Sequence, residues 1–420
     1  MKRLLWVGDA VFQSGFALAT HKILDTLRHH YDVTVLGINY YGDPHDHPYP
    51  IYGAIMGGDA MGVGRIVWMC DLVQPDVIVI QQDGWQIQPY VQQLRRKKPN
   101  GEYWFPEHAA VPIVAALAVD GKNFRSRWLE GVDLAIFWTQ FALAEAREGG
   151  YVGAAQVIPL GVDLETYYPV DRDGALDRLK IGQFRDKFIV GNVNRNQPRK
   201  RWDLTLKFFA EWVGTRKIDD ALLFLHAAPT GDNGIDIEQM ANYYGIAHLM
   251  IGRTPPAFCG ATEDVMRDTY NVFSVQVTTT QGEGFGLTTF EGMACGVPQV
   301  VPDWAALGEL CRGAASMVPC VATGINPVSP GLNVIGGVPD KRTFVDALDA
   351  LYRVEGHREL VGRLGLERAS EDRFRWANVG LAWVTALAEV FEPTDQAVRQ
   401  DVSIVTDEAW QDLGRAEGVV

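Results

Sequence analysis

The sequence predicts an α/β protein built from two parallel-sheet domains. Short apolar runs alternate with longer amphipathic stretches, which is the pattern of β-strands joined by helices that cover both faces of a parallel sheet. The alternation restarts after a turn-rich connector at 161–174 (GVDLETYYPVDRDG). A chain of 420 residues also exceeds the usual size of one domain. We therefore expect two domains of about equal size, with a hinge near 165–180.

The expected strands fall into two series. The first series comprises 4–8, 33–38, 76–81, 102–107, 134–138 and 156–160, and helical stretches such as 15–29 and 139–148 separate its members. The second series comprises 188–193, 222–228, 248–253, 272–280 and 299–304. An amphipathic helix is expected at 376–391, before a tail that loses clear pattern and gains acid. The predicted division is a first domain at 1–170, a second at 171–375, a closing helix at 376–392 and an acidic tail at 393–420.

Composition limits the classes of function. The formal net charge is −14, whereas a protein that binds duplex nucleic acid usually carries a basic surface. The five cysteines (70, 259, 295, 311 and 320) lie in apolar stretches without a CxxC pair, which favours thiols of a reducing compartment. The first apolar run is broken at Gly8-Asp9, and no window approaches the length of a membrane span. We expect a cytoplasmic protein without stable membrane insertion.

The most informative segment is TTTQGEGFGLTTFEGMACGVPQVVPDW at 278–304. A strand ends near Thr280, a glycine-rich turn follows, and a helix begins around Leu287. Free N–H groups at a helix start attract anions, and glycines let the backbone approach a ligand closely. Glu283 and Glu291 flank the turn, and a carboxylate can accept two hydrogen bonds from a vicinal diol. The segment favours a ligand with hydroxyls on both sides of a diphosphate; the alternative is a tight turn with surface acids.

A second segment, VGNVNRNQPRKRWDLTLKFFAEW at 190–212, places several bases at one strand–helix junction. These bases are Arg195, Arg199, Lys200 and Arg201. Concentrated positive charge at such a junction favours an anion, and both Arg and Lys suit phosphate oxygens. The alternative is a solvated basic helix start.

Together these segments resemble the donor site of retaining GT-B glycosyltransferases of family 4 (glycosyltransferases group 1), through E-GFGLTTF-E followed by GMACGVPQV. The resemblance covers about residues 1–392, and it implies an α/β protein whose two Rossmann-like domains face each other across a cleft. The first Glu and the turn amides would bind the sugar hydroxyls, and the second Glu would bind the ribose diol. The implied residues are Glu283, Gly284, Phe285, Gly286, Leu287 and Glu291.

In the same family two bases hold the pyrophosphate, and Arg195 and Lys200 have the matching spacing. The sequence departs from the family pattern twice. Asn192 stands where an arginine often follows the glycine, and Arg201 replaces the glycine after the lysine. Which of Arg199, Lys200 and Arg201 serves the phosphate therefore stays open.

The resemblance also points to first-domain residues. Gly15, beside Ser14 at the first helix start, matches a glycine whose amide binds the donor phosphate. His108, after the expected strand at 102–107, matches a histidine whose carbonyl lies under the sugar; a structural or acceptor-side role is the alternative. Asp83 and Trp85 follow another expected strand and should face the cleft. The expected catalytic residues are Glu283, Lys200, Arg195 and His108.

No metal and no cofactor are expected besides a nucleotide-sugar co-substrate, with a UDP-sugar favoured. The sequence has no HExxH and no P-loop, and the run His45-Asp46-His47 lacks a distant partner. The acceptor stays open: a glycan, a lipid, a small molecule or, because Arg95–Lys98 form a basic cluster, a modified DNA base in the manner of phage transferases. A nucleotide-sugar or glycan binding module without turnover is the alternative from another class. The oligomeric state is also open.

Overall fold

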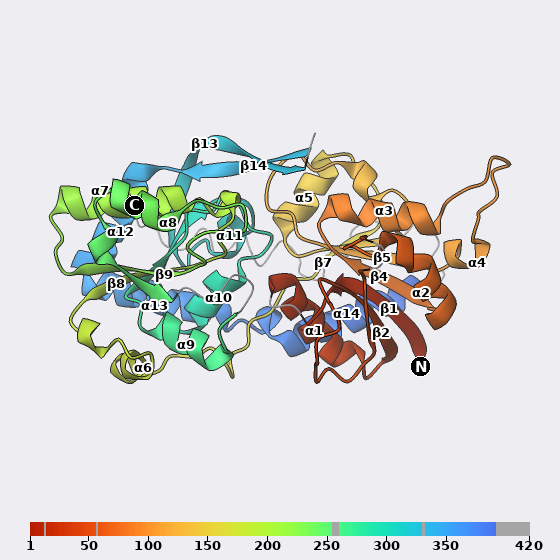
Figure 1. Ribbon diagram of the computed structural model, residues 1–420, viewed down its shortest axis with the longest axis horizontal. Coiled ribbons are helices and arrows are strands. Elements are labelled where there is room, and N and C mark those ends of the chain that lie inside the picture. Colours follow the sequence, from red (N-terminus) through yellow and green to blue (C-terminus); the bar gives the residue numbers. More distant parts are fainter. Residues whose placement is uncertain (12–13, 56–57, 254–259, 330–331, 392–420) are drawn as a thin grey trace, which may run out of the picture.

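The computed structural model describes residues 1–11, 14–55, 58–253, 260–329 and 332–391. It consists of two α/β halves that lie side by side (Figure 1). Each half contains a seven-stranded sheet, with the strand orders β3-β2-β1-β4-β5-β6-β7 and β10-β9-β8-β11-β12-β13-β14. Strand pairing is parallel except between β13 and β14. The predicted fold class, two parallel-sheet α/β domains, is confirmed.

The first half is formed by the amino-terminal part of the chain and combines the first sheet with the helices α1 to α5. Its strands are β1 Lys2–Asp9, β2 Tyr31–Ile38, β3 Ile51–Gly53, β4 Val77–Gln81, β5 Ile113–Leu117, β6 Leu134–Phe137 and β7 Ala155–Val157. Its helices are α1 Gly15–Leu27, α2 Ile66–Val73, α3 Gly84–Leu94, α4 Pro106–Ala109 and α5 Gln140–Glu148. The central strands are buried on both faces, as β4 and β5 show along their whole length. Continuous apolar runs form such strands because helices cover both sides of the sheet.

The second half repeats this plan. Its strands are β8 Phe188–Val193, β9 Ala221–His226, β10 Met250–Arg253, β11 Val275–Val277, β12 Gln299–Asp303, β13 Ser316–Ser329 and β14 Leu332–Pro339. Its helices are α6 Arg172–Arg178, α7 Trp202–Arg216, α8 Ile237–Tyr243, α9 Glu263–Asn271, α10 Leu287–Ala294, α11 Ala305–Leu310, α12 Lys341–Arg353 and α13 Glu355–Ala369. A single 3₁₀ turn, Pro198–Lys200, precedes α7.

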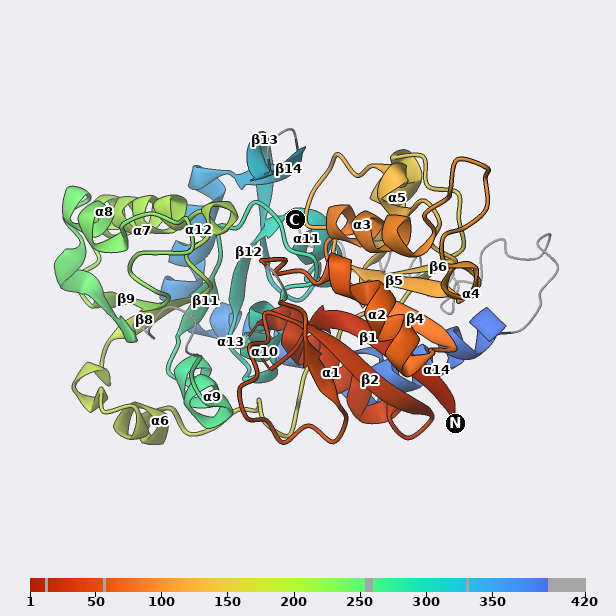
Figure 2. The same cartoon turned by 45° about the vertical axis from the view of Figure 1, so that its right-hand side comes forward.

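The last described helix, α14 (Trp376–Phe391), returns to the first half and packs along α1. Both views show it beside β1 and α1 (Figures 1 and 2). Trp383 on α14 is 1% exposed, and its ring lies 5.3 Å from that of Trp6 in β1. The chain passes between the halves twice, and the two passing segments contact each other: the Val162 N–H donates a hydrogen bond to the Phe374 carbonyl at 2.8 Å. The halves are therefore joined by two adjacent segments.

The β13–β14 hairpin forms a third connection, this time through space. It extends from the second half to the first along the top of the molecule (Figure 1). Ile335 in β14 exchanges two backbone hydrogen bonds with Lys122, at 2.8 and 3.1 Å, and the Asn123 side-chain amide donates to the Asn333 carbonyl at 2.7 Å. Leu332 is buried in the core of the first half. The hairpin thus adds a short strand pairing between the halves.

The structure corrects one predicted strand. Residues 102–107 do not form one: Tyr103 and Trp104 are exposed, Trp104 lies near the cationic groups of Arg96 and Lys98, and a helix begins at Pro106. The fourth long strand of this half is instead β5, whose sequence IVAAL contains two alanines of low strand propensity. β3, β13 and β14 were not predicted either, and the predicted tail at 393–420 lies outside the described residues.

No helix within the described ranges has both the length and the apolar character needed to cross a membrane.

Candidate active site

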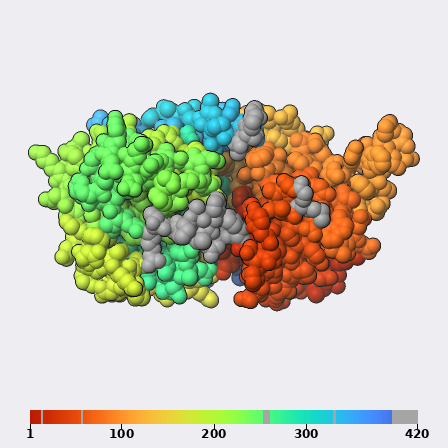
Figure 3. Space-filling view, in the orientation of Figure 1, coloured from red at the N-terminus to blue at the C-terminus, as the bar shows by residue number. Residues whose placement is uncertain are grey.

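A cavity of about 670 Å³ lies between the two halves. The space-filling view shows the groove that separates the two lobes, with the hairpin above it (Figure 3). Its walls come from segments that follow β1, β4 and β5 in the first half and β8 and β11 in the second. These are the carboxyl ends of parallel strands, where α/β proteins place their ligand sites.

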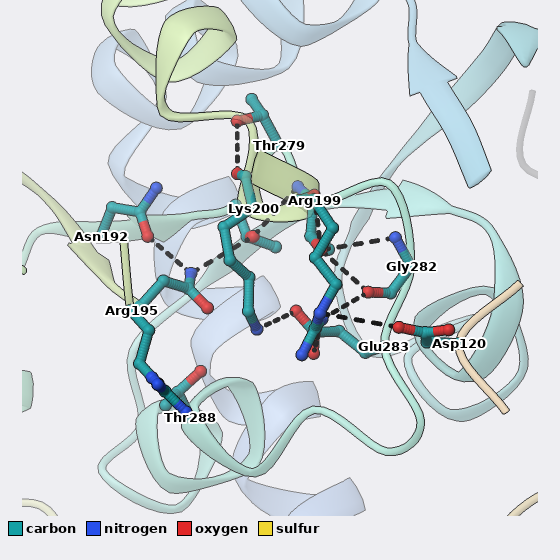
Figure 4. A network of polar contacts seen from close by, with 12 residues as sticks. Asp120, Asn192, Arg195, Arg199, Lys200, Thr279, Gly282, Glu283 and Thr288 are labelled. Atoms are coloured by element: carbon teal, nitrogen blue, oxygen red, sulfur yellow. Dashed lines mark hydrogen bonds and ion pairs between the residues drawn. The ribbon is translucent and has the colours of Figure 1, made fainter. Parts of the chain in front are cut away.

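Two bases converge on one carboxylate in this cavity. The Lys200 Nζ lies 2.5 Å from Oε1 of Glu283, and an Arg199 guanidinium nitrogen lies 3.1 Å from Oε2. Arg199 also donates to the Gly282 carbonyl at 2.9 Å. Figure 4 shows both bases reaching from the turn before α7 toward Glu283. Of Arg199, Lys200 and Arg201, only Arg199 and Lys200 line the cavity. Which of them would hold a phosphate stays a prediction.

The electrostatics of this trio follow from burial and pairing. Burial is the largest influence on Lys200 and lowers its pKa to about 8, although Glu283 opposes the shift. Burial acts to raise the pKa of Glu283, but Lys200 and Arg199 outweigh it and bring that pKa to about 2. Glu283 is therefore ionised at neutral pH. The trio then has a net charge of +1, and a bound polyanion would compete with Glu283 for the two bases.

A buried polar network supports the turn that carries Arg199 and Lys200. The Asn192 amide donates to Oγ1 of Thr205 at 3.0 Å, and that hydroxyl lies 2.7 Å from Oγ1 of Thr279. Thr279 in turn donates to the Arg201 carbonyl at 2.8 Å. Satisfied buried networks hold a loop in one geometry. Asn192, which departs from the family pattern, therefore supports the turn that carries Lys200.

The remaining two bases of the segment have different places. Arg195 lines the cavity, and its guanidinium pairs with Asp232 at 2.7 Å. Arg201 pairs with Asp203 at 2.8 Å and does not line the cavity.

The glycine turn before α10 faces the first half directly. A Cβ on Gly282 would lie 1.6 Å from the Asp120 carbonyl oxygen, and Gly286 has a φ of +102°. Only glycine fits such close backbone approach and such a φ. A Cβ on Gly15, at the start of α1, would lie 3.3 Å from the Leu287 side chain. The structure thus brings Gly15, Glu283, Gly284, Phe285, Gly286 and Leu287 together at the cavity wall.

Glu291 lies one turn further along α10 and is not part of this wall. Its Oε2 accepts a hydrogen bond of 2.5 Å from the Tyr270 hydroxyl. Burial raises the pKa of Glu291 to about 7. Its role with the ribose stays a prediction.

The first half contributes carboxylates to the cavity. Asp9 accepts hydrogen bonds from Ser14 at 2.9 Å and from Asn39 and Gln82 at 3.2 Å each. Asp120 lies 3.6 Å from Nε of Arg199, and Asp83 lies at the start of α3. Burial raises the pKa of all three, that of Asp83 to about 7. The expectation that Asp83 and Trp85 face the cavity is met.

The structure corrects the placement of His108. It lies in α4, which precedes β5 and so sits at the amino end of that strand, far from the cavity (Figure 1). His108 is 5% exposed, and its ring stacks on Phe105 and lies 2.9 Å from Asp71. The shift follows from taking 102–107 as the strand when the strand is 113–117. Residues 118–124 follow that strand into the cavity, and Asp120 is the acid among them.

Asp120 and the hairpin residues Asn326, Pro327 and Val334 were missed in the sequence. The run VPIVAALAVDG at 111–121 is an apolar segment that ends in an acid and a glycine, and this signal could have identified Asp120. No local signal marks the hairpin residues, because distant pairing brings them to the cavity.

In the run His45-Asp46-His47, both histidines are half-buried and Asp46 is exposed. His21 and His47 stack with ring centres 3.5 Å apart, and His21 bonds the Val11 amide and the Tyr49 hydroxyl. In the described part of the chain, no group of three His, Cys, Asp or Glu side chains is arranged to hold a metal ion. The Arg95–Lys98 cluster does not line the cavity.

Comparison with known proteins gives relatives in sequence and in structure. No protein-family model matches the chain. Curated proteins named D-inositol 3-phosphate glycosyltransferase are similar: that of Kribbella flavida is 29% identical over 227 residues, 53% of this chain and 48% of the relative. That of Frankia alni is 30% identical over 248 residues, 58% of this chain and 54% of the relative. The matches thus span only about half the length of these relatives.

Solved structures share the fold over nearly the whole chain. Sucrose-phosphate synthase from Thermosynechococcus elongatus has a TM-score of 0.72 at 16% identity and covers 93% of this chain and 99% of its own. Anabaena HepE in complex with UDP and glucose has a TM-score of 0.68 at 14% identity and covers 93% of this chain and 100% of its own. The architecture is therefore that of GT-B proteins, and the resemblance to GT-B glycosyltransferases of group 1 is confirmed.

Proposed function

We propose that this chain is a retaining glycosyltransferase that moves a sugar from a UDP-sugar to an acceptor hydroxyl. One observation carries the proposal: Lys200 and Arg199 converge on Glu283 beside a glycine turn that opens α10 and faces Gly15 across the cavity. This arrangement offers bases to a diphosphate and a carboxylate to sugar hydroxyls. A structural neighbour, HepE, was solved with UDP-glucose, which supports the choice of donor.

In the proposed reaction the C1–O bond to the diphosphate breaks and a bond from C1 to the acceptor oxygen forms. The acceptor proton passes to the departing diphosphate on the same face, so the anomeric configuration is kept. Lys200, Arg199 and Arg195 stabilise the negative charge that grows on the leaving group, a task for which other transferases use a metal ion. The retaining outcome rests on the E-x7-E resemblance of Glu283 and Glu291.

The test begins with ligand stabilisation. UDP or UDP-glucose at 100 times its Kd should raise the free energy of unfolding by about 2.7 kcal/mol. NAD at the same concentration as UDP should raise the free energy of unfolding less, because the loop after β1 lacks the GxGxxG fingerprint of dinucleotide sites. Thermal unfolding measures both effects. An equal or larger effect of NAD would overturn the assignment.

Proton NMR of the first-formed product then reports its anomeric configuration. With an α-linked donor and EDTA present, we expect transfer to continue and the product to keep the α configuration. A β-linked product would refute retention, and loss of transfer that Mn²⁺ restores would refute metal independence.

A further inference from the structure

The two walls of the cavity carry opposite charge. The bases Arg195, Arg199 and Lys200 all come from the second half, which also contributes the acids Asp232 and Glu283, so this wall has a formal net charge of +1. The first half contributes the acids Asp9, Asp83 and Asp120 and a single base, Lys122, which pairs with Glu145 at 3.4 Å. In the proposed reaction the basic wall faces the donor diphosphate. The acidic wall is then left to face the acceptor.

Of these three acids, Asp83 has the fewest partners within the described protein. Asp9 has three hydrogen-bond donors and Asp120 lies near Arg199. Within the described ranges, by contrast, the Asp83 carboxylate forms neither a hydrogen bond nor an ion pair. Asp83 immediately precedes α3, and its side chain makes no capping hydrogen bond to that helix. Asp83 is half-buried in the cavity wall. A carboxylate that has lost part of its hydration is stabilised by hydrogen-bond donors. Its oxygens are therefore available to accept hydrogen bonds from O–H or N–H groups of a ligand.

Two uncharged side chains on the same wall give independent support. Oε1 of Gln86 and Nε1 of Trp138 are buried and have no hydrogen-bond partner within the described chain. Trp138 is only 5% exposed, and both residues line the cavity. Gln86 offers an acceptor and Trp138 a donor, and a hydroxyl can satisfy either one. Trp85 and Trp128 add aromatic surface to this wall.

We propose that the acidic wall binds a polyhydroxylated acceptor ring that carries no phosphate or carboxylate, and that it favours an amino-substituted ring. Hydroxyl and ammonium groups donate hydrogen bonds to Asp83 and Gln86. An anionic group offers acceptors rather than donors to these oxygens, and it meets like charge wherever Asp9, Asp83 and Asp120 are ionised. This inference rests on the proposed function and names the acceptor class of the same site.

Matched acceptor pairs test the proposal: glucose against glucose 6-phosphate, myo-inositol against its phosphate, and glucosamine against glucose. With a UDP-sugar donor, UDP release measures transfer. We expect kcat/KM to be about tenfold or more higher for each unphosphorylated member, and glucosamine to exceed glucose. Better use of the phosphorylated members would overturn the proposal, as would no transfer to any neutral or amino ring by an enzyme that hydrolyses its donor.

The variant Asp83→Asn keeps the shape of the side chain and removes its charge. We expect it to erase the advantage of glucosamine and to lower kcat/KM for neutral rings about tenfold, with the UDP Kd within about twofold of the unmodified protein. Asp32→Asn, exposed on β2, is the matched control. An unchanged acceptor preference in a folded Asp83→Asn protein would refute the role of the acidic wall. If the unmodified protein does not bind UDP at all, the proposed function is refuted instead.

Discussion

Lys200 and Arg199 share a single carboxylate, and this sharing has a consequence for catalysis. A donor diphosphate would draw the Lys200 ammonium toward charge that grows as the bond to C1 breaks. Lys200→Ala should therefore lower kcat by roughly 10²–10³, as for other preorganised charge donors. Glu283 keeps Arg199 as a partner at 3.1 Å, so the variant is not left with an unpaired buried acid.

Initial-rate kinetics measures this effect. The matched control is Arg201→Ala, because Arg201 pairs with Asp203 outside the cavity, and its kcat should stay within about twofold. An unchanged kcat for Lys200→Ala would remove the assigned role.

Single residues were predictable where they lie in one continuous motif. Glu283 and the turn at 284–287 are adjacent in sequence, so a local pattern was enough to place them together. His108 was misplaced and Asp120 was missed for one shared reason, namely that an exposed aromatic segment resembled a strand more than the alanine-containing β5 did. When a strand is predicted at the wrong place in the sequence, the residues expected at its carboxyl end are wrong as well.

At the level of elements, the β13–β14 hairpin has the largest consequence for the cavity. It contributes Asn326, Pro327 and Val334 to the lining and pairs with the first half at Lys122. The sequence could not predict this, because the partner segment lies about 200 positions away in the chain and the pairing is made by backbone groups.

Gly121 allows the hairpin to dock. A Cβ there would lie 2.5 Å from the Ile335 carbonyl oxygen and 2.6 Å from the Val334 side chain. We expect Gly121→Val to lift the hairpin, admit water to the cavity and raise the ratio of donor hydrolysis to transfer.

Gly356→Val serves as the control, since a Cβ at that exposed position on α13 meets nothing within 4 Å. Measuring free sugar and transfer product together gives the ratio for both variants. Equal ratios would show that the docked hairpin has no part in excluding water.

At the level of the whole molecule, the α/β alternation was enough to predict two parallel-sheet domains. The repeated period of strand and helix makes this the most robust signal in the chain. How the domains meet was not predictable, because the contacts between Gly282 and Asp120 or between Lys122 and Ile335 join distant segments.

The contact between α14 and the first half should be measurable as stability. Trp383 is 1% exposed against Trp6, so Trp383→Ala should lower the free energy of unfolding by about 3–5 kcal/mol. Leu381→Ala, at a position that is 54% exposed on the same helix, should change it by less than about 1 kcal/mol. Denaturant unfolding compares the two, and similar losses would mean that α14 contributes little to the first half.

The return of α14 also fixes an order of events during synthesis. The surface of the first half around Trp6 and α1 is complete only when residues 376–391 have left the ribosome, after the whole second half has emerged. Until then an apolar face that belongs to the earliest-made segment stays uncovered. The second half has no such dependence, because its strands and helices are contiguous from α6 to α13. The later-made domain can therefore be the first to finish folding.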